Sequence, residues 1–214
     1  YWQAEYRRKN TNPLKSSLQK LNITVSDNCL SLSGETNNFF TYGKAKKGFG
    51  IRMFAGYTSI PKQDFSGNYY KMSISGRDSL SDYLFDEIFL GRTEAKGILS
   101  QQFVNDYAGF KTATSYYRLA EKWMFGFNMN TTLPGLLPFR LFANAGAFDK
   151  SDVDSTYGKI SWEIGVDLPI IKDIFVIYLP FAYSDDIKYA VEKQDLKTEN
   201  LIRFELHLNL LNPL

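Results

Sequence analysis

The sequence predicts an all-β protein, an antiparallel transmembrane β-barrel, and three observations lead to this fold class. Short segments alternate between apolar and polar residues, charges gather on one face of these segments, and short connections alternate with long ones. Successive side chains of a strand point to opposite faces, so each segment has one apolar and one polar face. That pattern is typical of a barrel with lipid outside and water inside.

The clearest alternation lies in two segments of the second half of the chain. In the first, polar or small residues separate the apolar residues Trp123, Phe125, Phe127 and Met129. In the last, one face carries Ile202, Phe204, Leu206 and Leu208, and the other carries Arg203, Glu205, His207 and Asn209. The apolar face of both segments is free of charge.

The first half of the chain contains fewer regular segments. Strands are predicted over 1–8, 18–26, 47–58 and, more briefly, 69–76. A turn is predicted at 11–13, and a polar loop from about 27 to 38. Residues 83–90 are apolar on both faces, which fits a buried strand or a helix equally well.

The second half predicts six strands, approximately over 109–118, 122–133, 139–148, 160–168, 174–183 and 201–210. The connections 134–138 and 169–173 are short, whereas 149–159 and 184–200 are long and polar. Short turns at one rim and long loops at the other are typical of outer-membrane barrels. Aromatic residues that fit girdles at the membrane interface are Trp2, Tyr57, Trp123, Trp162, Tyr178 and Tyr183.

Charges decide which face is the polar one. In four predicted strands, one face carries Arg52, Arg140, Glu163, Asp167, Arg203 and Glu205, and the opposite face carries no charge in its central stretch. An Arg or Lys that faces lipid at mid-depth costs roughly 2–4 kcal/mol. The segregation therefore favours a membrane barrel, with a half-buried soluble sheet as the alternative.

Composition excludes several classes of protein. No stretch approaches the roughly 20 apolar residues of a membrane-spanning helix, and a net charge of +2 gives no support to nucleic-acid binding. The single cysteine, Cys29, precludes an internal disulfide and a multi-cysteine metal cluster. No cofactor or metal is assigned.

The single histidine, His207, limits the chemistry of the chain. A zinc peptidase of the His-Glu-x-x-His type needs two histidines on one helix face. A lipid hydrolase in the barrel wall with His207 as its base is conceivable, but no nucleophile elbow supports it. We expect this chain not to be an enzyme.

The residues 89–98, Phe-Leu-Gly-Arg-Thr-Glu-Ala-Lys-Gly-Ile, resemble the inward-folded loop motif of the BamA/TamA-type surface-antigen superfamily of outer-membrane barrels. Further segments resemble that family's strands in the same order: Gly109-Phe110, 141–146, 165–169, 178–180 and 203–206. The resemblance runs from about Asp82 to the end of the chain. The family's tip arginine falls on Lys96 and its aspartate on Asn144.

The resemblance implies a loop over 89–108 that folds into the lumen, with Lys96 and Gly97 at its tip and Gly91 in its lead. It also implies partners for that loop on the inner wall, for which we expect Glu163, Asp167, Arg203 and Glu205. The family's barrel has sixteen strands, so residues 1–214 are expected to form a single barrel domain, the carboxy-terminal portion of a longer chain. In a Bacteroidota branch of this family, which the chain resembles, such a barrel sometimes follows a zinc aminopeptidase domain.

The expected function is that of a barrel in the bacterial outer membrane that anchors a larger protein and, by the resemblance, assists insertion or secretion of polypeptides. The expected partners are outer-membrane lipid, lipopolysaccharide and other outer-membrane or periplasmic proteins, with no nucleic acid. The alternatives are a small complete barrel acting as porin or adhesin, a lipid hydrolase that uses His207, and, more distantly, a soluble lipocalin-like binder.

Overall fold

A computed structural model describes residues 2–12, 14–26, 29–42, 47–59, 72–79, 82, 85, 87–93, 97–113, 119–133, 138–150, 160–171, 174–195 and 201–208. Nine strands form one antiparallel sheet. They are β1 (Trp2–Asn10), β2 (Lys15–Ser26), β3 (Cys29–Tyr42), β4 (Lys47–Ser59), β7 (Ala120–Thr132), β8 (Arg140–Lys150), β9 (Ile160–Ile171), β10 (Phe175–Tyr183) and β11 (Arg203–Leu206).

The four other elements are small. Two-residue strands β5 (Arg77–Asp78) and β6 (Phe103–Val104) pair with each other, η2 (Ile98–Gln101) is one 3₁₀ turn, and α1 (Asp185–Lys193) is the single α-helix of the described residues. None of the described helices is both long and apolar enough to cross a membrane. The all-β fold class predicted from the sequence is therefore confirmed at the level of an antiparallel sheet.

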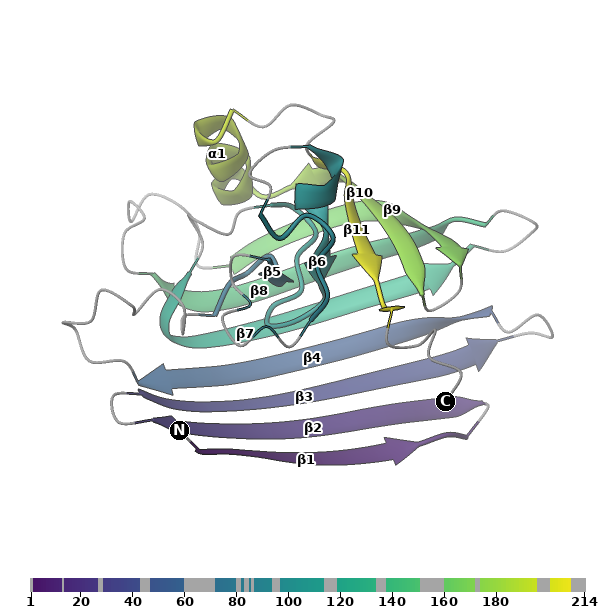
Figure 1. Cartoon of the computed structure of the whole chain (residues 1–214). Coiled ribbons are helices and arrows are strands. Elements are labelled where there is room, and N and C mark those ends of the chain that lie inside the picture. The colour runs from purple at the N-terminus through teal and green to yellow at the C-terminus, as the bar shows by residue number, and fades with distance from the viewer. Residues whose placement is uncertain are drawn as a thin grey trace.

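Each strand of the large sheet pairs with the next one in space, in the order β1-β2-β3-β4-β7-β8-β9-β10-β11. The sheet curls around the segments that connect β4 to β7, and these segments lie on its concave side (Figure 1). In the described residues, β1 and β11 form the two edges and do not pair with each other.

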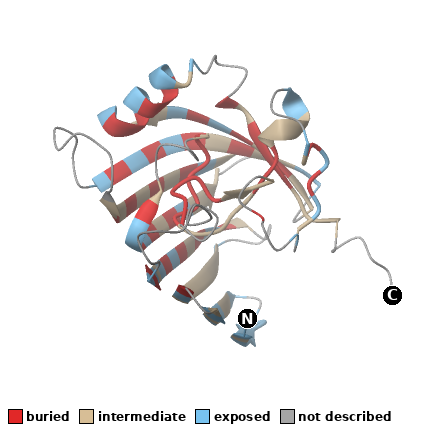
Figure 2. Ribbon diagram, turned by 60° about the vertical axis from the view of Figure 1, so that its left-hand side comes forward, coloured by how far each residue is buried: buried red, intermediate tan, exposed pale blue. Residues whose placement is uncertain are grey.

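The two faces of the sheet differ as the alternation predicted. Along β7, Trp123 and Phe125 are 46% and 41% exposed, whereas Met124 and Asn128 are 1% and 7% exposed. The alternating red and blue bands of Figure 2 show the same two-residue period along several strands. We call the concave side the inner face and the convex side the outer face.

The predicted strands agree best with β4, β7, β8, β9 and β10, whose bounds lie within a few residues of the predicted ones. The predicted loop over 27–38 is wrong, because Cys29–Tyr42 forms β3, which pairs with β2 and β4 along its full length. Its polar run at 35–38 resembles a loop in composition. Pairing with two neighbouring strands overrides that local preference.

Two further predictions differ from the structure. Residues 109–113 of the predicted strand 109–118 cross the inner face as irregular chain, and 114–118 lie outside the described residues. The predicted loop 184–200 contains α1, which begins after Ser184 with two acidic residues in its first turn and ends at Lys193. These end charges complement the helix dipole, and the buried residues Ile187, Ala190 and Val191 follow the spacing of one helix face.

Of the predicted strand 69–76, residues 69–71 lie outside the described residues, and Ser73 makes only an isolated bridge with Leu119. Within 83–90, the described residues lie in no helix or strand. Residues 72–75 are buried in the chain that covers the inner face, whereas Phe85, Ile88 and Leu90 are more than half exposed.

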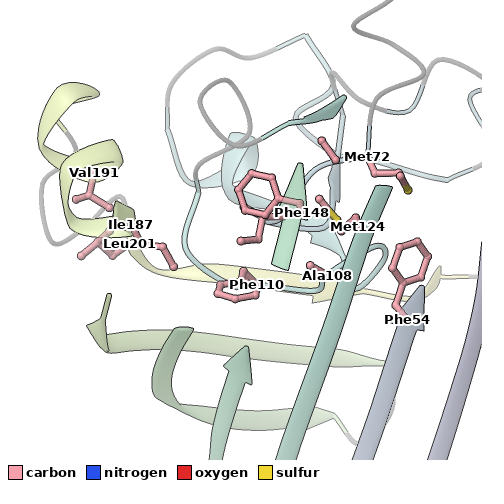
Figure 3. Close-up of a cluster of buried hydrophobic side chains, with 11 residues drawn as sticks. Phe54, Met72, Ala108, Phe110, Met124, Phe148, Ile187, Val191 and Leu201 are labelled. Carbon is pink, nitrogen blue, oxygen red and sulfur yellow. The ribbon is translucent and has the colours of Figure 1, made fainter. Parts of the chain in front are cut away.

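Two apolar clusters join this chain to the sheet. The larger includes Phe54 and Met124 of the sheet, Met72, Ala108 and Phe110 of the inner chain, and Ile187 and Val191 of α1 (Figure 3). The smaller consists of Phe103, Phe142, Val176 and Tyr178. Both clusters lie on the inner side of the sheet, so the inner chain packs as a core rather than as a loose loop.

Candidate functional site

The candidate site is the contact between the inner face and residues 102–113, which we call the interior segment. Phe103, Ala108, Phe110 and Thr112 of this segment are fully buried. Its backbone is tied to the other inner chain by a hydrogen bond of 2.9 Å from Phe110 N to Ile74 O. The polar inner face of the sheet supplies the remaining contacts.

Glu163 of β9 is the centre of these contacts. Its carboxylate accepts hydrogen bonds from the backbone N–H groups of Lys111 (2.5 Å) and Thr112 (3.0 Å), from Thr112 Oγ1 (2.6 Å) and from Asn144 Nδ2 (2.7 Å). A buried carboxylate is tolerated when its oxygens are fully hydrogen-bonded. Glu163 is completely buried, and four donors from the described residues satisfy its carboxylate.

Arg52 of β4 holds the same segment from the other side. Its guanidinium donates to Tyr107 O (2.7 Å), to Asn128 Oδ1 (2.8 Å) and to Glu35 Oε2 (2.8 Å). Asn128 in turn donates to Ala108 O (2.7 Å). A planar guanidinium can serve three acceptors in fixed directions, which an ammonium cannot do as well.

These polar residues form one row across four strands. Arg52 pairs with Asn128, Asn128 with Asn144, and Asn144 with Glu163 in the registers of β4–β7, β7–β8 and β8–β9. A hydrogen bond of 2.9 Å from Asn128 Nδ2 to Asn144 Oδ1 continues the row. We call Arg52, Asn128, Asn144 and Glu163 the polar row.

Glu205 and Arg203 of β11 contact the start of the interior segment. Glu205 accepts from Asn105 N (2.7 Å) and from the hydroxyl of Tyr178 (2.5 Å). Arg203 donates to Ser75 O (3.0 Å) and lies 4.4 Å from the centroid of the Phe103 ring. Both charged side chains are buried, so the segment covers them from water.

Lys111 is the buried cation of the interior segment. Its ammonium lies 4.8 Å from the ring centroid of Tyr178 and 5.0 Å from that of Phe103, a cation–π arrangement. No carboxylate oxygen of the described residues forms an ion pair with it. Burial lowers the pKa of Lys111 to about 8, although the charges of Glu205 and Glu163 oppose this shift.

The structure places the four predicted inner-wall residues on the inner face, all of them buried. Glu163, Glu205 and Arg203 contact the interior segment or the chain beside it, whereas Asp167 pairs with Arg140 at 2.5 Å. Among the described residues, backbone N–H groups of the interior segment bind both glutamates.

The predicted tip residue Lys96 lies outside the described residues. Gly97 precedes η2 with a φ of 99°, and the Cα of Gly91 packs against Leu99, so that a Cβ at this position would lie 2.5 Å from the carbonyl carbon of Leu99. Arg92, next to Gly91, donates to Asp82 at 2.7 Å. These residues precede the interior segment.

Sequence reasoning missed the role of Gly109, Lys111 and Thr112, because their stretch was interpreted as a strand. The sequence did contain one indication of a close approach between chain segments, namely the two adjacent small residues Ala108 and Gly109. Gly109 has a φ of +68°, and a Cβ there would lie 2.8 Å from Asn128 Oδ1 and 2.9 Å from an Arg52 nitrogen. Only glycine allows this close approach to the polar row.

Tyr178 was expected in an interface girdle, which is wrong. It lies on the inner face, 7% exposed, with its hydroxyl on Glu205. The two-residue period of β10 explains the difference, because Tyr178 shares a face with Val176 and Pro180.

The contacts of the site are mainly hydrogen bonds to buried polar side chains. The backbone of His207, the only histidine of the chain, donates to Ile174 O at the end of β11. No group of three or more metal-ligating side chains occurs within the described part of the chain. A polar cavity of about 270 Å³ borders the interior segment, with Arg52, Lys111, Arg140, Asn128 and Asn144 in its wall.

Comparisons of the chain with protein-family models, with curated proteins and with solved structures gave no match.

Proposed function

We propose that this chain is part of the wall of a bacterial outer-membrane β-barrel that anchors a larger protein in the membrane. The observation that carries the proposal is the outer face. A large apolar residue is more than a third exposed on each of eight strands, namely Trp2, Leu21, Leu32, Tyr57, Trp123, Leu141, Trp162 and Phe181. Glu163 and Arg203, by contrast, are buried on the inner face.

Lipid explains this distribution better than water does. Monomeric soluble proteins rarely expose contiguous apolar patches larger than a few hundred Å², and this face extends from β1 to β10. In lipid the same face is favourable, and the charged residues are shielded on the inner side.

The positions of the tryptophans support the same orientation. Trp123 pairs with Tyr57, at the ends of β7 and β4 nearest to the connection 60–119. Trp2 pairs with Val25, at the start of β1 and near the end of β2. Trp162 lies close to the start of β9, after the long connection 151–159. Aromatic residues at one rim form the girdle of an outer-membrane barrel.

The edges of the sheet support a larger barrel. Within lipid, an unpaired strand edge leaves backbone N–H and C=O groups without partners, and β1 and β11 do not pair with each other in the described residues. We propose that further strands of a longer chain close the wall, in keeping with the sixteen strands of the family it resembles.

The finer function rests on the resemblance of residues 82–214 to the surface-antigen superfamily. We propose that the barrel assists insertion or secretion of polypeptides, that its partners are lipid, lipopolysaccharide and periplasmic or outer-membrane proteins, and that this chain carries no enzymatic activity. Because the interior segment is buried, we favour a barrel whose lumen is filled, rather than an open porin.

The three tryptophans give a direct test, because all of them lie on the outer face and the chain has no others. The protein is refolded into vesicles whose acyl chains carry bromine at a shallow or a deep carbon. We expect strong quenching of tryptophan fluorescence, with shallow bromine more effective than deep bromine, and weak quenching by aqueous acrylamide. A protein that stays monodisperse without detergent and is quenched only by acrylamide would overturn the proposal.

A conductance measurement in the same vesicles distinguishes an open porin from the proposed barrel wall with a filled lumen. Steady ion conductance would favour an open pore, whereas absence of conductance with full bromine quenching is the result expected for a wall with a filled lumen.

A further inference from the structure

The polar cavity beside the interior segment lies on the concave side of the sheet, and positively charged side chains predominate in its wall. It has a volume of about 270 Å³, and Arg52, Lys111 and Arg140 all contribute to its wall. Pockets for drug-sized ligands have volumes of about 300–1,000 Å³. This cavity is therefore of a size for a small ligand.

Lys111 is the most buried of these cations, and its ammonium has no acceptor within the described residues. The side chain is 3% exposed, and the rings of Phe103 and Tyr178 lie beside the ammonium without accepting a conventional hydrogen bond. An ammonium carries three N–H donors, and leaving a buried charged donor unpaired costs free energy. Because Lys111 borders the cavity, a ligand there could supply the acceptor that the described residues do not.

Arg140 of β8 offers further donors to the same cavity. Its Nε donates to Asp167 at 2.5 Å, and its two terminal nitrogens make no hydrogen bond within the described part of the chain. Arg140 pairs with Asp167, and Asp167 pairs with Tyr178, in the registers of β8–β9 and β9–β10. Neighbouring strands lie about 4.8 Å apart, so Arg140 is only two strands away from the ring that Lys111 contacts.

Asn130 of β7 adds a neutral amide to the wall. It pairs with Gly50 of β4, and a Cβ at Gly50 would lie 2.9 Å from Asn130 Oδ1. The absence of a side chain at Gly50 thus leaves room for the Asn130 amide, which makes no hydrogen bond to the described residues. An amide of this kind has two N–H donors for a ligand.

The carboxylates near the cavity are already occupied. Asp167 is the one acidic residue among the described residues of the wall, and it pairs with Arg140. Glu163 and Glu205 act on the charge of Lys111 from behind the wall, but backbone N–H groups and hydroxyl groups bind their oxygens. The donors that remain unused in the wall therefore favour an anion over a cation.

From these groups we propose that the cavity is a binding site for a phosphate group, with Lys111 and Arg140 as charged donors and Asn130 as a neutral one. The terminal nitrogens of an arginine fit two oxygens of a phosphate, and a lysine binds it as a point charge. The phosphate would belong to inorganic phosphate or to a small phosphate monoester. The proposal goes beyond membrane anchoring and does not require the outer face to contact lipid.

The test is equilibrium dialysis of the full chain, folded in detergent, against radiolabelled inorganic phosphate at constant ionic strength. At pH 7 Lys111 is protonated, because its pKa is about 8. We expect saturable binding of a single phosphate per chain, and Lys111→Met should lower the affinity by about tenfold or more. Lys20→Met is the matched control, because Lys20 borders a separate cavity, and it should leave the affinity nearly unchanged.

Arg140→Lys keeps the proposal testable if Lys111→Met folds poorly. A lysine preserves a cation for Asp167 but lacks the two terminal nitrogens, so we expect phosphate affinity to fall several-fold while the protein stays folded. Competition by glycerol 3-phosphate distinguishes the two sources, since a monoester that displaces label at lower concentration than unlabelled phosphate identifies the larger ligand. Absence of saturable phosphate binding to the unsubstituted protein, or equal losses for Lys20→Met and Lys111→Met, would refute the site.

Discussion

Asn144 Nδ2 donates a hydrogen bond of 2.7 Å to Glu163 Oε1, between directly paired residues of β8 and β9. The same carboxylate binds two consecutive backbone N–H groups of the interior segment. The polar row thus connects the curvature of the sheet to the segment that fills its concave side. Changes along this row should therefore affect how firmly the interior segment is held.

Glu163→Gln should destabilise the fold. The amide of glutamine is neutral, and its NH₂ group would face the donors that now bind the carboxylate of Glu163. Each charge-assisted hydrogen bond that is lost costs about 1.5–3 kcal/mol. We expect the temperature at which the folded band disappears on a semi-native gel to fall markedly. The control is Glu121→Gln, at an exposed position of β7, which should leave that temperature unchanged.

Arg52→Lys should weaken the attachment of the interior segment although it keeps the charge. A lysine cannot reach Tyr107 O, Asn128 Oδ1 and Glu35 together, and we expect a loss of about 1–3 kcal/mol for the acceptors left without a partner. Faster protease cleavage within residues 102–113 would report this change. Cleavage at an unchanged rate would show that the charge alone holds the segment.

Gly109→Ala should destabilise the protein by about 1–3 kcal/mol, because a Cβ at a positive φ is strained and here also meets Arg52 and Asn128. Gly34→Ala on β3 is the matched control. Its Cβ would meet only the end of the Leu21 side chain at 3.2 Å. Thermal unfolding in detergent should separate the two variants, and similar losses for both would contradict this account of Gly109.

Lys111 should make stability depend on pH in the alkaline range. Its folded pKa of about 8 lies below the usual 10.5, so between these values the unfolded chain binds more protons than the folded one. The contribution of Lys111 to the free energy of unfolding is therefore lowest below pH 8. It rises by about 3 kcal/mol in all as the pH approaches 10.5. Lys111→Met should remove this rise, which a comparison of unfolding curves at pH 7.5 and pH 10 would measure.

Met53→Arg tests the outer face. Met53 lies near the middle of β4, 40% exposed, and an arginine facing lipid at mid-depth costs roughly 2–4 kcal/mol. We expect the yield of refolding into vesicles to fall. Thr24→Arg is the control, because Thr24 borders a polar cavity on the inner side and should tolerate the charge. Equal effects of both changes would argue against lipid at the outer face.

The sheet was predictable wherever one face of a strand is apolar without interruption. In β7, the alternation from Trp123 to Met129 places Asn128 on the inner face, as the structure confirms. In β3, Glu35, Asn37 and Asn38 carry no such signal, because their environment comes from β2 and β4 on either side. In β11, the alternation placed Phe204 correctly on the outer face, but it did not predict that Phe204 is only 7% exposed beside Gln102.

The candidate site was predictable in part for the same reason. Glu163, Asp167, Arg203 and Glu205 share the inner face because residues of one strand alternate, and this follows from local geometry. The backbone N–H groups that Glu163 and Glu205 bind come from residues 102–113, which are distant in the chain. Neither the left-handed backbone at Gly109 nor the burial of Lys111 has a periodic pattern in the sequence.

Which side of each regular strand is apolar follows from the order of the residues, because the direction of a side chain along a strand depends only on its position in the repeat. Which segment occupies the concave side, and what lies beside β11, follows instead from how the strands pack in space. Both depend on contacts between residues far apart in the chain, where a few hydrogen bonds to Glu163 and Arg52, and the bridge between Gln102 and Phe204, select one path among many of similar local preference.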